Sequence, residues 1–362
     1  MSEQFDIAVI GSGAAGIAAA VCAARAGRNT LLLDKNNSAG GTGGFSGLTT
    51  LCGLCDDTGN FLNDGFAKEF AGAIAETAPL QMGKAWVLPY RQEKFRAIAE
   101  KFFADESKLQ TRWNTLLANV VVENNRIISL NDFVVGAVID CSGSAEVARK
   151  IGIECLETDE TTQASAVIFP LHNVVREMLT SAAAAQVLLP LARAGFPSVN
   201  FQSNLEPNSV TVKFAGSPEQ VPSLIEFLRA TIHGFENCST PLKKSSVARR
   251  AGRMIVGEYV LTGADVLAAK KFPDAAAKCA WPVEQWNAAG KTRLRYLPPG
   301  EHYEIPARSL RAAKIKNLFM AGKTISADVD AIASARVMGC CLATGAAAGN
   351  LAANYLDCAK QK

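Results

Sequence analysis

The sequence lacks several features that mark membrane, secreted and nucleic-acid-binding proteins. It has no apolar run approaching the ~20 residues that a helix needs to cross a bilayer. No basic segment followed by an apolar stretch stands at the N-terminus, so no secretory signal is expected. The net charge is only +3 over 362 residues, which gives no reason to expect nucleic acid as a partner. We therefore expect a cytoplasmic protein that acts on a small molecule.

Histidine is scarce, with three residues, whereas cysteine is not, with ten. Because the cysteines are scattered and no export signal is seen, we expect reduced and mostly buried thiols. Cys52 and Cys55 could supply two ligands to zinc, but no nearby Cys/His pair completes such a site. The sequence therefore predicts no metal centre.

What the chain does contain is a glycine-rich turn between a strand and a helix. A short apolar strand, Asp6 to Ile10, precedes it, and an alanine-rich helical stretch, Ala14 to Ala26, follows it. A second strand, Thr30 to Leu33, ends at an acid about 20 residues further on. This order is typical of the G-x-G-x-x-G dinucleotide-binding fingerprint. Its residues here are Gly11, Ser12, Gly13, Ala14, Ala15 and Gly16.

Each residue type has a physical role in such a turn. Gly11 permits the tight turn, Gly13 lets the backbone approach a pyrophosphate, and Gly16 lets the helix pack closely on the strand. The helix N-terminus offers unpaired N–H groups to the phosphates. Asp34, with Lys35 beside it, can accept hydrogen bonds from a ribose diol. Since the fingerprint occurs once, we expect no second Rossmann domain for NAD(P)H.

Four later segments and the glycine-rich loop at residues 40–44 carry a resemblance to a known family. They are V-I-D-C-S-G at 138–143, R-M-I-V-G-E-Y-V-L-T at 253–262, N-L-F-M-A-G-K at 317–323, and A-I-A-S-A-R-V-M-G-C-C-L-A-T-G-A-A-A-G at 331–349. With these the sequence resembles the FAD-dependent oxidoreductase family, which is related to the fumarate reductase and glutathione reductase flavoproteins. The resemblance implies FAD as the cofactor. It also implies cofactor contacts by Gly41, Thr42, Gly43, Leu117, Cys141, Ser142, Gly143, Gly322, Asp328 and Ile332.

The chain departs from the family pattern at one point. Lys323 stands where an acid often follows the Ala-Gly of the ribityl-binding loop, so Asp328 is the candidate for the ribityl contact. Leu117 is the best match to the adenine-contacting backbone. The resemblance also implies that the helix beginning near Ala331 points its N-terminus at the flavin pyrimidine ring.

The order of elements predicts the fold class. We expect an α/β protein with an FAD-binding, Rossmann-type (glutathione reductase-like) domain and an inserted mixed α+β substrate domain. A helix over Glu93 to Phe103, four strands between 109 and 140, a strand over Asn317 to Ala321 and a long helix over Arg336 to Asn354 belong to the first. Strands over Ala164 to Phe169 and Ser209 to Phe214 belong to the second. The predicted boundaries are 1–158 and 301–362 for the FAD-binding domain and 159–300 for the substrate domain.

Three side chains are candidates for chemistry at the flavin. His172 and His302 are each a possible acid/base or substrate ligand, or an ordinary polar residue. Arg336 either stabilises the anionic reduced flavin or forms an ion pair at a domain contact. In the basic run Lys243, Lys244, Arg249, Arg250 and Arg253, the last two match arginines of the family, and a carboxylate-binding role for them stays open.

Cys52 and Cys55 follow the glycine-rich loop that the resemblance places beside the flavin. Three alternatives are open for this pair. The thiols are buried and inert, they form a redox dithiol that exchanges electrons with the flavin, or one forms a covalent thioether to the flavin.

The function we expect is FAD-dependent oxidation or reduction of a small organic substrate. A hydride passes to or from flavin N5, and an external acceptor or donor carries the electrons, because no NAD(P)H domain is predicted. The alternatives are a flavin-linked dithiol/disulfide reductase using Cys52 and Cys55, and a non-catalytic FAD-fold binding subunit. Modification of tRNA is disfavoured by the small net charge.

Overall fold

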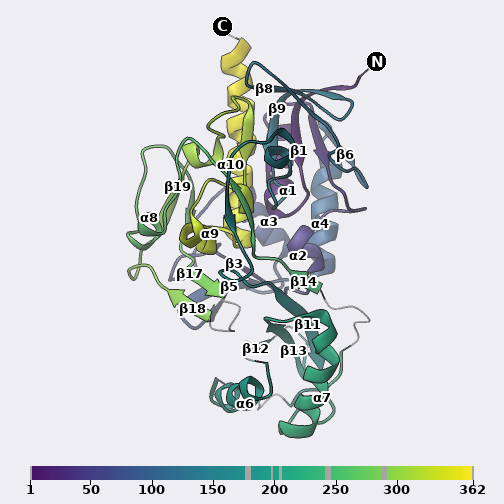
Figure 1. The fold of residues 1–362 in the computed structure, drawn as a ribbon, viewed down its shortest axis with the longest axis vertical. Helices are drawn as coiled ribbons and strands as arrows, with labels where there is room; N and C mark the ends of the chain where they lie inside the picture. The colour runs from purple at the N-terminus through teal and green to yellow at the C-terminus, as the bar shows by residue number, and fades with distance from the viewer. Residues whose placement is uncertain are drawn as a thin grey trace.

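A computed structural model describes residues 2–175, 181–196, 199–203, 206–240, 246–286 and 292–360. Lys243 and Lys244 of the basic run lie outside these residues. Figure 1 shows an elongated molecule, with both termini at one end of a larger body and a smaller lobe at the other end.

A seven-stranded sheet forms the centre of the larger body. Its strand order is β6-β2-β1-β9-β8-β7, and β20 pairs with β9. The strands β1, β2, β6, β9 and β20 run parallel, whereas β8 and β7 form an antiparallel extension. Their bounds are β1 (Gln4–Ile10), β2 (Thr30–Leu33), β6 (Leu109–Arg112), β7 (Val120–Glu123), β8 (Arg126–Leu130), β9 (Phe133–Asp140) and β20 (Leu318–Met320). The carboxyl ends of the parallel strands therefore meet at one edge, where open α/β sheets bind ligands.

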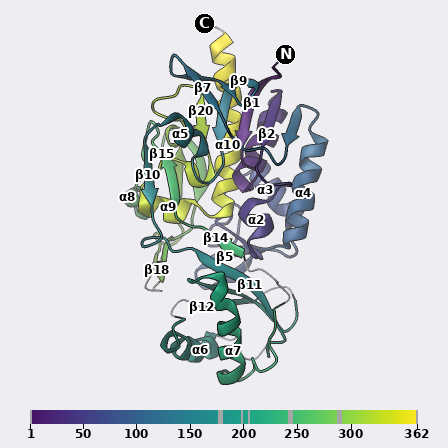
Figure 2. The same ribbon diagram turned by 45° about the vertical axis from the view of Figure 1, so that its right-hand side comes forward.

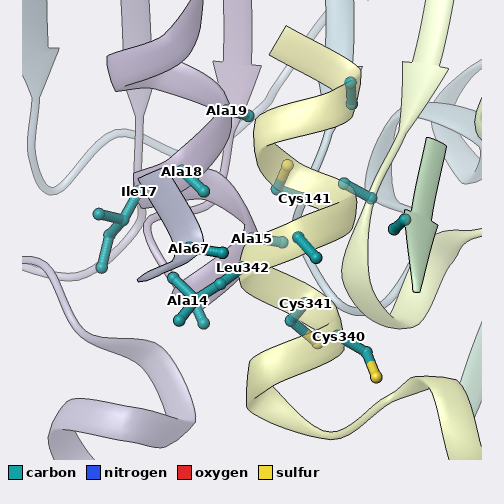
Figure 3. Close-up of a cluster of buried hydrophobic side chains, with 14 of the residues drawn as sticks. Ala14, Ala15, Ile17, Ala18, Ala19, Ala67, Cys141, Cys340, Cys341 and Leu342 are labelled. Atoms are coloured by element: carbon teal, nitrogen blue, oxygen red, sulfur yellow. The ribbon is translucent and has the colours of Figure 1, made fainter. Parts of the chain in front are cut away.

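Two helices of small residues, α1 (Ala14–Arg25) and α10 (Met338–Lys360), pack side by side against this sheet (Figure 3). A Cβ atom at Gly345 would lie 2.1 Å from the carbonyl oxygen of Ala15, and one at Gly349 would lie 2.6 Å from that of Ala19. No side chain fits at either contact, so the two backbones approach closely. This packing holds the start of α1 in place. The helices α2 (Gly41–Phe45), α3 (Phe66–Ile74) and α4 (Gln92–Asp105) lie beside α1.

The smaller lobe, visible at the bottom of Figures 1 and 2, has an antiparallel sheet of its own. Its strand order is β12-β13-β11-β14, from β11 (Ala166–His172), β12 (Val199–Ser203), β13 (Ser209–Phe214) and β14 (Ser246–Ala248). The helices α6 (Ser181–Arg193) and α7 (Val221–Thr231) pack with it around a separate apolar core that includes Phe169, Val212 and Leu224. The lobe falls within the region 159–300 predicted for the substrate domain.

Residues that follow the lobe return to the larger body. β15 (Gly252–Ile255) pairs with β10 (Cys155–Thr158), β16 (Ala275–Cys279) with β19 (Tyr303–Pro306), and β17 (Val283–Trp286) with β18 (Thr292–Arg295). Met254, Leu261 and Val283 join the same buried core as α1. The remaining elements are β3 (Thr50–Cys52), β4 (Leu80–Met82), β5 (Ala85–Pro89), α5 (Glu146–Ile151), α8 (Gly263–Leu267), α9 (Val329–Ala335) and short 3₁₀ turns at Pro218–Gln220, Ala307–Leu310 and Gly322–Thr324.

Most strands of the sequence prediction are confirmed, and so is the long C-terminal helix expected from Arg336 to Asn354, which is α10. A separate short helix, α9, ends just before it at Ala335, with a bend of 95° between the two. The alanine- and glycine-rich sequence is equally compatible with one helix or two, and packing decides. Within the described residues, no single helix is long and apolar enough to cross a membrane. The bent pair α9 and α10 reaches that length and apolar composition only when the two helices are taken together.

Candidate active site

The glycine-rich turn has the geometry of a phosphate-binding loop. Gly11 has a φ of +97°, and a Cβ there would lie 2.7 Å from the carbonyl oxygen of Cys141. A Cβ at Gly16 would lie 1.7 Å from the carbonyl oxygen of Gly11. Both positions therefore require glycine. Gly13 precedes the first residue of α1 and makes no side-chain cap, so the first N–H groups of the helix are left for a ligand.

Gly13 differs from its neighbours because it faces open space. An added Cβ would meet no protein atom within 4 Å, and its φ of −72° suits any residue. The protein alone gives no reason for glycine here. A pyrophosphate lying against the backbone gives one, so the turn fits the FAD that the resemblance implies.

Asp34 fastens the loop to the end of β2. One of its carboxylate oxygens accepts hydrogen bonds from the backbone N and the Oγ of Ser12, both at 2.6 Å. The other accepts from the backbone N and the Nδ2 of Asn36, both at 2.8 Å. These protein donors use the acceptor positions of the carboxylate. Asp34 thus positions Ser12, and its ribose contact stays a prediction.

Two adjoining cavities lie near this loop, and the inner one reaches it. The outer one, of about 1170 Å³, is lined by Lys35, Gly41, Ser142 and Gly143 among others, and the inner one, of about 200 Å³, by Gly13, Ala14, Ala15, Gly43, Cys141 and Gly322. Thr42, Arg249 and Lys323 line both, so the cavities adjoin. The structure thus brings together residues from distant parts of the chain that the resemblance assigned to FAD.

Seven residues predicted to contact the cofactor line neither cavity; besides Gly11, Ser12 and Gly16 of the turn and Asp34, these are Leu117, Asp328 and Ile332. Leu117 packs against the apolar core beneath β7 and β8, and Ile332 is buried within α9. Asp328 is the N-cap of α9, where its carboxylate accepts hydrogen bonds from the backbone N of Ala331 at 2.7 Å and of Gly263 at 3.0 Å. Their cofactor contacts stay predictions.

The inner cavity ends at a wall of charged side chains. Lys213 reaches it from β13, Arg250 from the segment after β14, Glu284 from β17 and Arg336 from the end of α9. Trp281 lies beside them. Sequence reasoning singled out Arg336 and kept Arg250 open, but it missed Lys213, Glu284 and Trp281. The one available signal was Lys213 itself, the single charged residue in the strand Ser209–Phe214.

Glu284 is held as a carboxylate by two indoles. Its Oε1 accepts from Nε1 of Trp286 at 2.6 Å and its Oε2 from Nε1 of Trp281 at 3.0 Å. Burial alone would raise the pKa of Glu284, but Arg336, the two indole bonds and Arg250 together bring that pKa below its ordinary value. The cavity therefore contains one ionised acid.

Arg336 is the C-cap of α9. Its Nη2 makes long hydrogen bonds to Oε1 of Gln163, at 3.4 Å, and to the carbonyl oxygen of Glu284, at 3.3 Å, while its Nε has no partner in the described part of the chain. Burial lowers the pKa of Arg336. Of the two alternatives for this residue, an ion pair at a domain contact is not seen among the described residues. Its positively charged side chain lines the inner cavity.

The helix that points at the inner cavity is α10 and not the helix near Ala331. Val337, Met338 and Cys341, at its N-terminal end, line the cavity. The N-terminus of α9 is satisfied by Asp328 instead. The expectation that the helix beginning near Ala331 faces the flavin is therefore wrong, and the partial positive charge there comes from the next helix.

Neither candidate histidine lines either cavity. His172 stands at the end of β11 with its Nδ1 3.4 Å from a carboxylate oxygen of Glu206. His302 precedes β19, and burial and the neighbouring Lys271 lower its pKa. The structure offers neither residue a contact with a ligand in these cavities.

The two cysteines of the predicted dithiol do not act as a pair in the structure. Cys52 lines the inner cavity, Cys55 does not, and both are free thiols. Burial raises the pKa of each to about 11. Because the thiolate is the reactive form in disulfide exchange, these environments favour the inert alternative.

One disulfide is formed, between Cys279 of β16 and Cys340 of α10, with Cα atoms 5.9 Å apart. The expectation that the thiols are all reduced is wrong for this pair. The two residues are 61 positions apart in the sequence, and no local pattern connects them. The other eight cysteines are free.

Thiol titration should show this difference directly. We expect the protein, denatured without a reducing agent, to react at eight thiols, and at ten after reduction, since only the Cys279–Cys340 sulfurs are protected. A Cys279→Ser variant is the matched control and should give nine thiols in both conditions. Ten thiols before reduction would contradict the pairing.

Comparison with known proteins agrees with this geometry. A family model described as FAD dependent oxidoreductase matches residues 6–210 and 197–361. A search of curated protein sequences finds no significant match. Among solved structures, the chain is similar to a geranylgeranyl bacteriochlorophyll reductase-like protein from Thermoplasma acidophilum, at a TM-score of 0.54 and 12% identity over 99% of this chain and 80% of that chain.

Two further solved structures are similar to the chain. GidA of Aquifex aeolicus has a TM-score of 0.55 and 15% identity, over 98% of this chain and 63% of that chain. The flavin-dependent brominase Bmp2 has a TM-score of 0.52 and 10% identity, over 98% of this chain and 81% of that chain. At such identities the likeness shows the fold alone, whereas the family match extends over nearly the whole sequence. The chain therefore belongs to the FAD dependent oxidoreductase family of enzymes, and its cofactor is FAD.

Proposed function

We propose that this enzyme oxidises or reduces a small organic substrate in the inner cavity by hydride transfer between a substrate carbon and flavin N5. The observation that carries the proposal is the lining of that cavity. It combines Gly13 to Ala15, which are predicted to bind the phosphates, with the charged residues Lys213, Arg250, Glu284 and Arg336. A small molecule in it touches both the cofactor-binding side and polar groups suited to orienting a substrate.

The chain's own residues account for binding and orientation. Gly13 and the N-terminus of α1 would hold the pyrophosphate, and the N-terminus of α10 would face the flavin. When bound, FAD supplies the capacity to accept or donate a hydride. The aliphatic side chains Leu48, Ile168 and Val337 line the remaining cavity and limit the access of water to it. We propose an external electron carrier as the second partner, since the sequence has one dinucleotide fingerprint.

Anaerobic reduction of the flavin tests this proposal. The enzyme is mixed anaerobically with a panel of amines, hydroxy acids and reduced thiols. We expect at least one amine or hydroxy acid to bleach the flavin absorbance, and none of the thiols to do so. The dithionite-reduced enzyme, offered the corresponding imines and keto acids, tests the opposite direction. Free FAD with the same panel is the control. Bleaching by dithiols alone would contradict hydride transfer and favour dithiol chemistry.

A further inference from the structure

The charges around the inner cavity do not balance. Lys213, Arg249, Arg250, Lys323 and Arg336 line it, against Glu284 as the one acid among the lining residues described. Arg249 and Lys323 also line the outer cavity, where Glu146, Glu157 and Glu160 supply negative charge. Three cations confined to the inner cavity then face one carboxylate. An excess of buried positive charge is costly unless an anion compensates it.

Arg250 is fixed but not neutralised. Its guanidinium stacks on the ring of Trp286, with the Cζ 4.2 Å from the ring centroid, and its Nη1 donates to the carbonyl oxygen of Ala164 at 2.8 Å. In the part of the chain that the structure describes it forms no ion pair. Burial and the nearby charge of Arg336 lower the pKa of Arg250 to about 9. Stacking leaves the edge of the guanidinium open to a planar anion.

Lys213 is held in place by a chain of hydrogen bonds that joins three strands, β13, β12 and β3. Its Nζ donates to Oε1 of Gln202 at 2.7 Å, and Nε2 of Gln202 donates to Oγ1 of Thr50 at 2.6 Å. This chain uses one of the three protons on Nζ, and no described carboxylate pairs with the ammonium group. Burial is the main cause that lowers the pKa of Lys213, and Arg250 contributes to it. The ammonium is thus preorganised near a second uncompensated cation.

We propose that the substrate is a small carboxylate whose anionic group is bound by Arg250 and Lys213. The indole N–H groups of Trp281 and Trp286 are already engaged by Glu284, so the donors left for a ligand are cations; Arg336 is assigned to the flavin, and Lys213 and Arg250 are assigned to the substrate. The planar fork of Arg250 matches a carboxylate, and the point charge of Lys213 supports it from β13. A neutral substrate would leave both cations desolvated and unpaired. The inference rests on the proposed function, because it places this anion where the reacting molecule lies.

Binding of non-reacting anions to the FAD-loaded enzyme tests the assignment without turnover. Acetate and benzoate should perturb the flavin absorbance in a saturable way. The neutral amides acetamide and benzamide, added at the same ionic strength, should not. Lys213→Met and Arg250→Met should each weaken carboxylate binding about tenfold to a hundredfold, as expected for the loss of a hydrogen bond between charged groups. Lys213→Arg should restore part of the affinity. Lys68→Met is the matched control, because it removes one positive charge at the exposed Lys68–Asp64 pair. This variant should bind the carboxylates as tightly as the parent does.

Four results would overturn the inference. One is equal binding of acids and amides, and another is unchanged carboxylate affinity in both Met variants. The third is loss of FAD from Lys213→Met or Arg250→Met, which would assign these cations to the cofactor instead. Binding of inorganic phosphate in preference to both carboxylates would also contradict the substrate class. Failure of the proposed hydride transfer is separate, since it would appear as carboxylate binding with no bleaching by any hydroxy or amino acid.

Discussion

The Gly13→Val variant should fold normally and contain no flavin. An added Cβ at this position meets no protein atom within 4 Å, and the backbone φ of −72° is open to any residue, so neither strain nor a clash opposes folding. The same space is where the pyrophosphate approaches the backbone, and a branched side chain fills it. We expect the melting temperature of the flavin-free variant to equal that of the flavin-free parent, while the ratio of FAD to protein falls to near zero.

Gly16→Val is the matched control for Gly13→Val. Its Cβ would lie 1.7 Å from the carbonyl oxygen of Gly11, which is backbone and has no room to move. This variant should therefore lose soluble folded protein, and not the cofactor alone. Gly13→Ala should retain FAD with reduced affinity. A Gly13→Val protein that purifies with a full complement of FAD would refute the position of the phosphate site.

The Arg336→Met variant should have a lower flavin midpoint potential. Arg336 lines the inner cavity and forms no ion pair among the described residues, so its positive charge is available to stabilise negative charge on the reduced flavin. A hydrogen bond to a charged group is worth about 1.5–3 kcal/mol. For a two-electron couple this corresponds to a decrease of roughly 30–65 mV. Equilibration with a redox dye during anaerobic reduction measures the change.

Arg336→Lys should separate the charge from the shape of the side chain. It keeps the positive charge, and we expect it to retain most of the parent's potential. In Arg336→Met, Glu284 also loses a neighbouring cation that lowers its pKa, so a modest decrease in melting temperature is expected as well. An unchanged potential together with a large loss of stability would show that Arg336 has a structural role only.

The phosphate loop could be predicted from sequence because its geometry is local. A tight turn at Gly11, close packing at Gly16 and an open face at Gly13 all follow from the absence of a side chain within six consecutive residues. The strand before it and the helix after it have periodic apolar patterns that need no distant partner to be recognised. The cofactor follows from this unit and from the later segments that resemble one family.

The break between α9 and α10 could not be predicted in the same way. Small residues over 331–349 give a continuous helical pattern, and no proline interrupts it. After the 95° bend, Gly345 of α10 approaches the backbone of Ala15 in α1. This contact joins segments far apart in the chain, so only the packed structure selects the bend.

The amino-acid sequence by itself determined the cofactor, the family and the α/β class of this protein, since these depend on short motifs and on periodic patterns. The tertiary structure alone decided the wall of the inner cavity. Lys213, Arg250, Glu284 and Arg336 come from four separate elements, and the Cys279–Cys340 disulfide joins two more. The role of a charged residue in a strand or a loop cannot be recognised from sequence alone. Its pKa and its requirement for an oppositely charged partner depend on burial and on nearby charged groups, and these are set by the fold.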